Sequence, residues 1–311
     1  MSRSIPLPGS GRITVAALAV VPAVLAYPWQ STRDYWVLGI AAVVVILLFG
    51  WWRGLHFTTI LRRRLAMLGG RRRIRESLTR TTALVRVGTP VSEADAFPLP
   101  LLARYLDRYG IRADTIRITS RANASDERET WIGLTVSAAD NLAALQARSS
   151  RIPLQETARV ATRRLADHLR EMGWEAGTVA PEDVPELVGP DSRETWSGVL
   201  SGDSDYVAAY RVNVDDELLD TLAAIRSHPA RETWTAIEIA GDPHRYTVAA
   251  ACSFRTEERP GGAPPLSRLI PQRGNHRRAL TAMDPVSTQR IDGHTDAPAD
   301  LLTRLQPVSR T

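Results

Sequence analysis

Two apolar stretches near the start of the chain dominate its pattern of hydrophobic and polar positions. Ile13–Trp29 and Tyr35–Trp52 contain 17 and 18 residues, and neither holds a side chain that is charged at neutral pH. These lengths are at the lower end of what crosses the hydrocarbon layer of a membrane as a helix. Because only Gln30–Asp34 separates the stretches, residues 1–52 are predicted to form a transmembrane helical hairpin. The alternative for the first stretch is a cleaved signal peptide, with Val24-Leu25-Ala26 at its cleavage site.

Aromatic residues mark the ends of both stretches. Rings with a polar edge favour the headgroup level of a membrane, so a cluster around the connecting loop and a pair at the far end indicate the two interfaces. The expected interface anchors are Tyr27, Trp29, Tyr35, Trp36, Trp51 and Trp52.

Residues 53–80 form an arginine-rich juxtamembrane segment in which no acidic side chain precedes Glu76. The positive-inside rule therefore predicts a multi-pass protein of the inner (plasma) membrane, with both termini and the main domain in the cytoplasm. The same arginines are candidates to bind anionic lipid headgroups, at about 1 kcal/mol each; the alternative is that they only set the topology. They are Arg53, Arg62, Arg63, Arg64, Arg71, Arg72, Arg73 and Arg75.

From residue 81 to residue 283 the pattern changes to short alternating segments and helical stripes. Strands come in adjacent pairs between helices, which predicts an α+β cytoplasmic domain with a mixed, largely antiparallel sheet and packed helices. A mixed α/β sheet is the alternative. In the first half, strands are predicted at Thr82–Val87, Ile111–Arg121, Thr130–Val136 and Glu175–Ala180, and helices at Leu99–Tyr109, Asp140–Arg148 and Leu154–Met172.

The second half contains two expected hairpins, in which turn residues separate alternating segments. Their strands are Thr195–Leu200 with Tyr206–Val214, and Glu232–Ile239 with Tyr246–Phe254. Helices are predicted at Asp216–Ser227 and His276–Met283. Residues 284–311 form a C-terminal tail of weak periodicity, of the kind that becomes ordered against a partner.

The tetrapeptide Arg-Glu-Thr-Trp occurs three times, at 128–131, 193–196 and 231–234. Each occurrence precedes or opens a predicted strand, and the unequal spacings exclude a solenoid repeat. The favoured interpretation is that each tryptophan anchors the core while its arginine and glutamate stay solvated. Three tryptophans on one docking face are the alternative, and two copies of a unit built from a β-hairpin and a helix fit the repetition.

Composition narrows the classes of function. The chain has 311 residues, 44% of them hydrophobic and 23% charged, which fits a folded protein. All 39 basic residues are arginine, which excludes a Walker-type phosphate loop and lysine Schiff-base chemistry. Residues 1–80 hold 12 Arg and two acidic residues, a net charge of +10, whereas residues 81–311 hold 27 Arg and 32 acidic residues, a net charge of −5. The main domain is therefore not expected to bind nucleic acid.

One motif has a form known from metal chemistry. Asp203 and Asp205 make a D-x-D pair, and such carboxylates can hold a divalent cation on a nucleotide diphosphate, as in glycosyltransferases. The pair lies where a hairpin turn is expected, and Asp and Gly are the residues that turns favour, so the turn interpretation is preferred. Cys252, the single cysteine, lies in an apolar strand and is expected to be a small buried hydrophobe. The six histidines lack metal-ligand spacing, and no catalytic, cofactor-binding or metal-binding residue is predicted.

The chain resembles the EccE component of type VII (ESX) secretion systems. The resemblance is carried by the N-terminal hairpin, by the arginine-rich exit at Arg53–Arg75, and by Thr130–Ser149 (TWIGLTVSAADNLAALQARS), followed by the α+β domain. It implies a non-enzymatic inner-membrane scaffold beside the EccB, EccC and EccD subunits, with EccC as the ATPase. The short C-terminus is more similar to the ESX-3 branch, which is linked to metal acquisition. A membrane-anchored enzyme resembling glycosyltransferases and a lipid-surface regulator are the alternatives.

Overall fold

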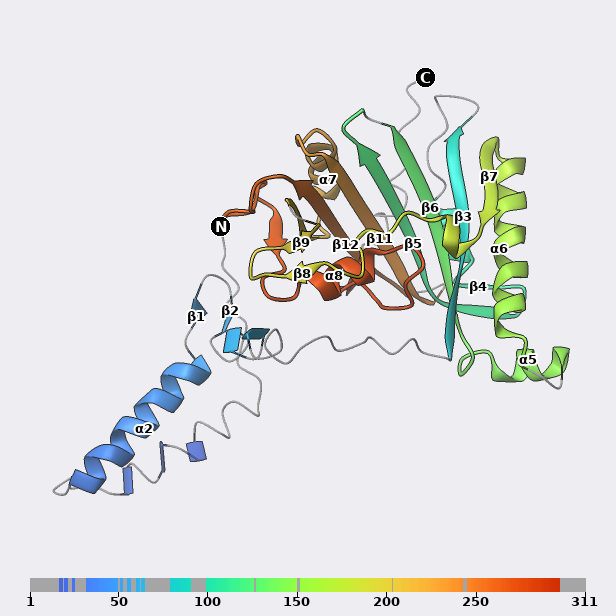
Figure 1. Cartoon of the computed structure of the whole chain (residues 1–311). Coiled ribbons are helices and arrows are strands. Elements are labelled where there is room, and N and C mark those ends of the chain that lie inside the picture. The colour runs from blue at the N-terminus through green and yellow to red at the C-terminus, as the bar shows by residue number, and fades with distance from the viewer. Residues whose placement is uncertain are drawn as a thin grey trace. The chain divides into compact units, whose positions relative to one another are not determined.

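The computed structural model describes most of the chain from residue 79 onward and shorter parts before it (Figure 1). The chain divides into two compact units, Met1–Arg72 and Arg73–Thr311. The described residues are 17–18, 20–21, 24–25, 32–49, 51–52, 55–56, 60–61, 63–64, 79–90, 99–125, 127–149, 152–202, 204–242 and 245–296.

The first unit contains one long helix, α2 (Thr32–Phe49). It covers most of the second predicted span, but it begins three residues before Tyr35 and ends three residues before Trp52. Beyond the helix, β1 (Trp51–Trp52) pairs in antiparallel fashion with β2 (Leu55–His56). In the first predicted span, residues 17–18, 20–21 and 24–25 are helical. Among the helices that the structure describes, none is both long and apolar enough to cross a membrane.

The second unit is built on a large antiparallel sheet. In its described residues the sheet has 12 strands, and its main path runs β7-β3-β6-β5-β11-β12-β10-β9-β8. To this path β4 adds on β5, β13 on β10 and β14 on β12. The strands are β3 (Arg80–Pro90), β4 (Asp107–Arg108), β5 (Ile111–Asn123), β6 (Arg128–Ser137), β7 (Trp174–Val179), β8 (Arg193–Glu194), β9 (Val199–Ser201), β10 (Asp205–Val212), β11 (Glu232–Asp242), β12 (Arg245–Thr256), β13 (Leu269–Pro271) and β14 (Thr295–Asp296).

The strand order of the sheet contains two copies of one unit. Along the chain the first copy runs β3, α4, β5, β6 and the second runs β10, α7, β11, β12. In each copy the last strand lies between the other two, giving β3-β6-β5 and β11-β12-β10. The copies meet where β5 pairs with β11, from Asn123 opposite Glu232 to Thr115 opposite Ala240. The order of the six strands therefore reads the same from either end, although the tetrapeptides at 128–131 and 231–234 open non-equivalent strands of the two copies, β6 and β11.

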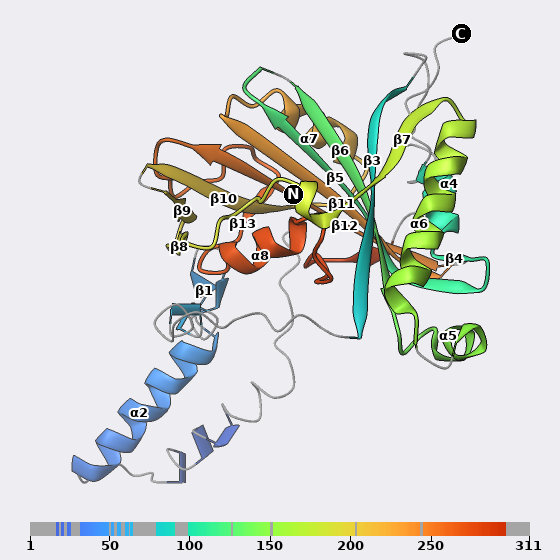
Figure 2. The same ribbon diagram turned by 45° about the vertical axis from the view of Figure 1, so that its right-hand side comes forward.

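Helices cover one face of the sheet, and one helix, residues 184–188 and the C-terminal segment pack on the other (Figure 2). The helix-covered face carries α4, α6 and α7, whereas α8 lies on the opposite face. The helices are α4 (Leu99–Arg104), α5 (Leu142–Arg148), α6 (Leu154–Glu171), the short 3-10 helix η1 (Pro181–Asp183), α7 (Leu218–Arg226) and α8 (His276–Met283).

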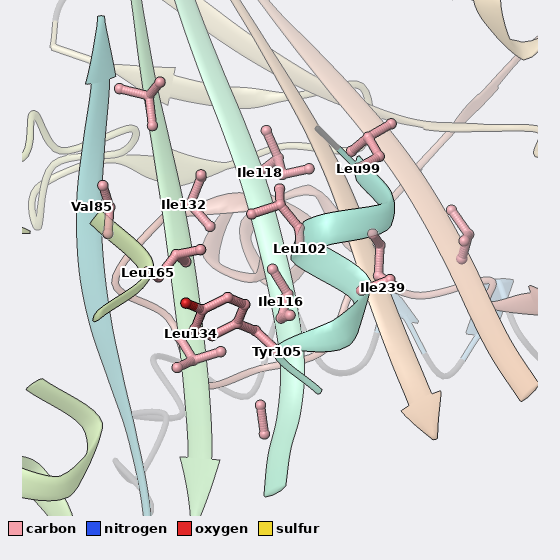
Figure 3. Close-up of a cluster of buried hydrophobic side chains, with 14 of the residues drawn as sticks. Val85, Leu99, Leu102, Tyr105, Ile116, Ile118, Ile132, Leu134, Leu165 and Ile239 are labelled. Carbon is pink, nitrogen blue, oxygen red and sulfur yellow. The ribbon is translucent and has the colours of Figure 1, made fainter. Parts of the chain in front are cut away.

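The larger core lies between the sheet and its helix-covered face. Figure 3 shows α4 over β5, with Leu102 beside Ile116 and Ile118. The predicted alternation of β5 is confirmed, because Ile116 and Ile118 both face this core while the residue between them faces the other side. On α6, Leu165 and Leu169 are fully buried, as their helical spacing predicts.

A strap, defined as residues 284–296, crosses the opposite face. The sequence assigned this segment to a tail, yet Ile291 is buried in the smaller core beside Trp131 and Trp234. Its end forms β14 on β12. A Cβ atom added to Gly133 of β6 would lie only 2.9 Å from the Pro285 carbonyl oxygen, so the strap runs directly over that glycine.

Several predicted elements are shorter than expected. The helix predicted for Leu99–Tyr109 ends at Arg104, because Tyr109 and Gly110 both have positive φ and turn the chain into the β4–β5 hairpin. The helix α6 ends at Glu171, which leaves Met172 at 42% exposure rather than on the buried stripe. Both hairpins of the second half are present, β9–β10 and β11–β12, but the predicted strand Thr195–Leu200 is largely wrong, because only its last two residues belong to β9 (Val199–Ser201).

Candidate interaction site

The expected membrane-contact residues fall in residues 27–75, and many of them lie outside the described residues. Arg53, Arg62, Arg71, Arg72, Arg73 and Arg75 lie outside those residues, as do Tyr27 and Trp29. Arg63 and Arg64 belong to a short helical stretch. Trp51 and Trp52 form β1 rather than the end of the helix.

Large apolar side chains of the first unit are exposed. On α2, Tyr35 is 60% and Trp36 69% exposed, and in the first predicted span Leu18 and Leu25 are each 77% exposed. A soluble surface seldom carries so many large apolar side chains close together, and such surfaces contact membranes or other proteins.

The D-x-D pair lies at the β9–β10 hairpin. Asp203 is outside the described residues, and Asp205 opens β10 opposite Ser201. One Asp205 carboxylate oxygen accepts a hydrogen bond from Arg231 Nη1 at 2.9 Å. A carboxylate already neutralised by a guanidinium is a poor cation ligand, so the pairing favours the turn interpretation.

The cysteine and the buried histidine that the structure describes serve the fold. Cys252 is fully buried in β12, and burial raises the pKa of its thiol far above the ordinary value. His276 is buried at the start of α8, where its Nδ1 accepts the backbone N–H of Ala209. Across the described segments, no three His, Cys, Asp or Glu side chains are grouped so that they could hold a metal ion.

Two of the three repeated tetrapeptides meet across the sheet. Trp131 and Trp234 stack with ring centroids 5.7 Å apart, and both are 1% exposed. The glutamates of the same tetrapeptides converge on one arginine of β5: Arg121 donates to Glu129 at 3.3 Å and also to Glu232. Core anchoring by tryptophan is therefore confirmed for these two copies, but their glutamates are paired rather than solvated.

The paired charges continue as a row over five strands. The row runs from β3 to β12 and consists of Arg86, Glu129, Arg121, Glu232 and Arg255. Burial alone would raise the pKa of Glu232, but hydrogen bonds from Arg255 and Arg121 outweigh it and hold the pKa below its ordinary value. In the remaining tetrapeptide, Glu194 accepts the backbone N–H of Arg277 at 3.2 Å, and thus binds the first turn of α8.

A buried clasp joins the two copies of the repeated unit under the strap. Arg117 of β5 and Glu238 of β11 are opposite each other and 2% and 0% exposed. Arg117 also donates to the backbone carbonyls of Asp284 and Ser287 at 2.9 Å, and to that of Gln289.

The same carboxylate holds the far end of the strap. Glu238 Oε1 accepts the Ile291 backbone N–H at 3.0 Å and lies 2.9 Å from His294 Nε2. Burial by itself would raise the pKa of Glu238, but hydrogen bonds from His294 and Arg117 outweigh it, so the pKa lies below its ordinary value. Every oxygen of this carboxylate is thus used in holding the fold.

Sequence reasoning missed this clasp, although a signal was present. Arg117 stands between Ile116 and Ile118, and Glu238 stands between two isoleucines in the same way. In a sheet covered on both faces, a charged residue between two core-facing residues must be buried on the opposite face and must find a countercharge. Two such positions of opposite charge predict a pair.

Comparisons with known proteins find a family model and several relatives that match the sequence of this chain. A family model described as the putative type VII ESX secretion system translocon EccE matches residues 124–212, which run from the end of β5 through β10. Two Mycobacterium tuberculosis relatives, from strains CDC 1551 / Oshkosh and H37Rv, are both described as ESX-3 secretion system protein EccE3. They are 70% and 69% identical over 303 residues, covering 96% of this chain and 92% of each relative.

A relative from Mycolicibacterium smegmatis carries the same description. It is 49% identical over 287 residues, covering 91% of this chain and 90% of the relative. Identity of this extent, over nearly the whole length of both proteins, is far above what a shared fold alone requires. The chain therefore belongs to the EccE family of type VII secretion components, in its ESX-3 branch.

Proposed function

We propose that this chain is a non-enzymatic scaffold subunit of an ESX-3 secretion complex, anchored in the inner membrane and docked beside the EccB, EccC and EccD subunits. The observation that carries the proposal is the 70% identity, over 96% of the chain, to an ESX-3 secretion system protein. A scaffold acts by holding partners in place, so its requirements are an anchor, a stable domain and a docking surface.

The anchor is residues 1–52, crossing the membrane twice at 13–29 and 35–52. Its support is the absence of charged side chains in both stretches, together with the exposed apolar side chains of α2 such as Trp36 and Ile40. The arginines of residues 53–80 then lie at the cytoplasmic surface, where anionic headgroups bind guanidinium groups.

The second unit supports a scaffold better than a transferase. Its most buried charges, Arg117 and Glu238, hold the sheet and the strap together. Asp205, the described half of the D-x-D pair, is neutralised by Arg231. These charges stabilise the fold and leave the described carboxylate of the motif poorly placed for metal-dependent transfer.

Purification from membranes tests the proposal. The full chain, tagged at its C-terminus, is extracted in mild detergent and its co-purifying proteins are identified. We expect the EccB, EccC and EccD subunits in the eluate. A chain without residues 1–52 should still give a folded domain but recover these subunits at least about tenfold less well, because loss of the anchor removes the high local concentration at the membrane. Normal assembly and secretion by the shortened chain would contradict the anchoring role.

A further inference from the structure

The two-residue turn between β4 and β5 has an unusual occupant. Asp107 pairs with Arg112 and Arg108 with Ile111, so Tyr109 and Gly110 form the whole loop. Their φ angles are 58° and 70°, and positive φ at both central positions is the type I′ geometry, which favours Asn or Asp followed by Gly. A bulky side chain at positive φ is strained. The turn itself therefore does not account for a tyrosine at position 109.

The ring of Tyr109 instead makes cation–π contacts with two arginines. The guanidinium carbon of Arg108 lies 5.0 Å from the ring centroid of Tyr109, and that of Arg164, on α6, lies 4.7 Å from it. Both distances are within the range of a cation–π contact. Tyr109 is nevertheless 51% exposed, so part of its side chain reaches solvent beside two positive charges.

Buried neighbours keep this arrangement in place. Tyr105, which follows α4 in Figure 3, is 3% exposed and donates its hydroxyl to the Arg164 backbone carbonyl at 3.2 Å. Its ring also meets the Tyr109 ring, with centroids 6.3 Å apart. Burial raises the pKa of Tyr105 to about 12, so this hydroxyl stays a donor at any physiological pH. The site is thus built on a hairpin and a helix that are fixed to each other.

Neither guanidinium group is paired with a carboxylate in the described part of the chain, although Arg108 also lies 4.8 Å from the Tyr105 ring centroid and its Nη1 is 3.3 Å from His168 Nδ1. Within the described residues no acidic side chain makes an ion pair with Arg108 or Arg164, whereas other arginines of the same elements are paired, Arg112 with Asp107 and Arg170 with Asp167. This concentration of positive charge lies on a part of the chain whose net charge is −5 over residues 81–311.

We propose that Arg108, Tyr109 and Arg164 form a docking site for an acidic segment of another protein subunit of the secretion complex. Carboxylates of the segment would accept hydrogen bonds from the two guanidinium groups, and the ring edge would pack against its apolar atoms. A membrane surface is a poorer match, because the ring already contacts two guanidinium groups and the buried Tyr105 ring and is not free to insert among headgroups. The inference rests on the proposed scaffold function and names the surface that it uses.

The geometry supplies a variant that separates docking from folding. Tyr109→Asn places a residue that the turn favours, so the thermal unfolding midpoint should stay the same or rise while the ring is lost. Arg164→Glu reverses one charge of the site. Arg163→Glu is the matched control, since Arg163 is also exposed on α6 but does not contact the ring. Tyr109→Phe keeps the ring and should behave like the unaltered chain.

The full-length variants are purified from membranes and the recovered subunits are quantified. We expect Tyr109→Asn and Arg164→Glu each to lower recovery about tenfold or more, while Arg163→Glu and Tyr109→Phe stay within about twofold of the unaltered chain. If the unaltered chain recovers subunits and all four variants do so equally, the docking site is refuted and the scaffold function stands. If the unaltered chain recovers none, both proposals fall.

Photocrosslinking then identifies the occupant. A benzophenone side chain introduced in place of Tyr109 in the full chain is irradiated in intact cells, and the adduct peptides are sequenced. Adducts within an Asp- and Glu-rich segment of a co-purifying subunit support the proposal. Adducts to lipid alone, or only to protein segments without acidic residues, overturn it.

Discussion

Arg117 is a buried charge that joins the sheet to the strap. It is 2% exposed, pairs with Glu238 and donates to three carbonyls of the strap. Arg117→Met should therefore lower the free energy of unfolding by about 3–5 kcal/mol, because it leaves a buried carboxylate without its countercharge. Urea unfolding of the full chain in detergent, followed by tryptophan fluorescence, measures this. Arg170→Met, at an exposed pair with Asp167, is the control and should cost less than about 1 kcal/mol.

Acid should weaken the fold through Glu238 and Glu232. Both carboxyls have a folded pKa below the ordinary value, so their stabilisation is complete above the unfolded pKa of about 4.3 and is lost as the pH falls through the lower folded pKa. Asp284, whose pKa burial raises, acts in the opposite sense but is a single group. The free energy of unfolding should thus decrease below about pH 5. Glu238→Gln should make the free energy of unfolding depend less steeply on pH. An equally steep dependence in that variant would show that other groups cause the acid effect.

The turn and metal-site interpretations of the D-x-D pair predict opposite effects of replacing both aspartates. Asp205 lies in a half-exposed pair with Arg231, and Asn preserves the local hydrogen bonds that turns use. Asp203→Asn combined with Asp205→Asn should cost well under about 1 kcal/mol and leave complex assembly and secretion near normal. Loss of a metal-binding carboxylate would instead reduce a transferase reaction by orders of magnitude. A double variant that folds and assembles but does not secrete would favour the transferase.

The strap is an element held by close approach to the sheet. A Cβ atom at Gly133 would meet the Pro285 carbonyl oxygen at 2.9 Å, so Gly133→Ala must push the strap away from β6. We expect a loss of about 1–3 kcal/mol in the free energy of unfolding, read by hydrogen exchange at the amides of Ile291 and Thr295. Gly177→Ala on β7, where nothing lies within 4 Å of the added atom, should be neutral. Unchanged protection at Ile291 in Gly133→Ala would contradict the contact.

Elements defined by local pattern could be predicted from the sequence, and those defined by distant contacts could not. The strands around Ile116 and Ile132 follow from alternation, and the β11–β12 hairpin follows from its turn residues. The strap shows weak periodicity because distant residues hold it in place. Arg117 binds the Asp284 carbonyl across 167 positions of the sequence, and Thr82 binds the Ser287 carbonyl across 205 positions. The contacts of Tyr109 could not be predicted for a related reason, since one of them is made with Arg164 of another element.

Charge asymmetry alone predicts how the whole molecule is arranged in the membrane. Twelve arginines and two acidic residues precede residue 81, and the arginines cluster after the second apolar stretch. Reporter fusions after Ser31 and after Thr311 should therefore read opposite sides, with the C-terminal reporter in the cytoplasm. A C-terminal reporter active outside the cytoplasm would invert the topology and move the proposed docking surface away from cytoplasmic partners.

The palindromic strand order also determines how long the edge of β5 stays unpaired while the protein is being synthesised. The 13-residue strand β5 leaves the ribosome about 110 residues before β11, the strand that closes its edge. At about 5–20 residues per second this is a delay of roughly 5–20 s. Throughout that interval the first copy of the repeated unit carries a long strand whose edge away from β6 has unpaired backbone groups, and such an edge pairs readily with other chains. A ribosome that pauses between the two copies would thus prolong the exposure of the β5 edge. The part of the nascent chain most prone to aggregation is therefore the same edge that later pairs with β11 and joins the two copies.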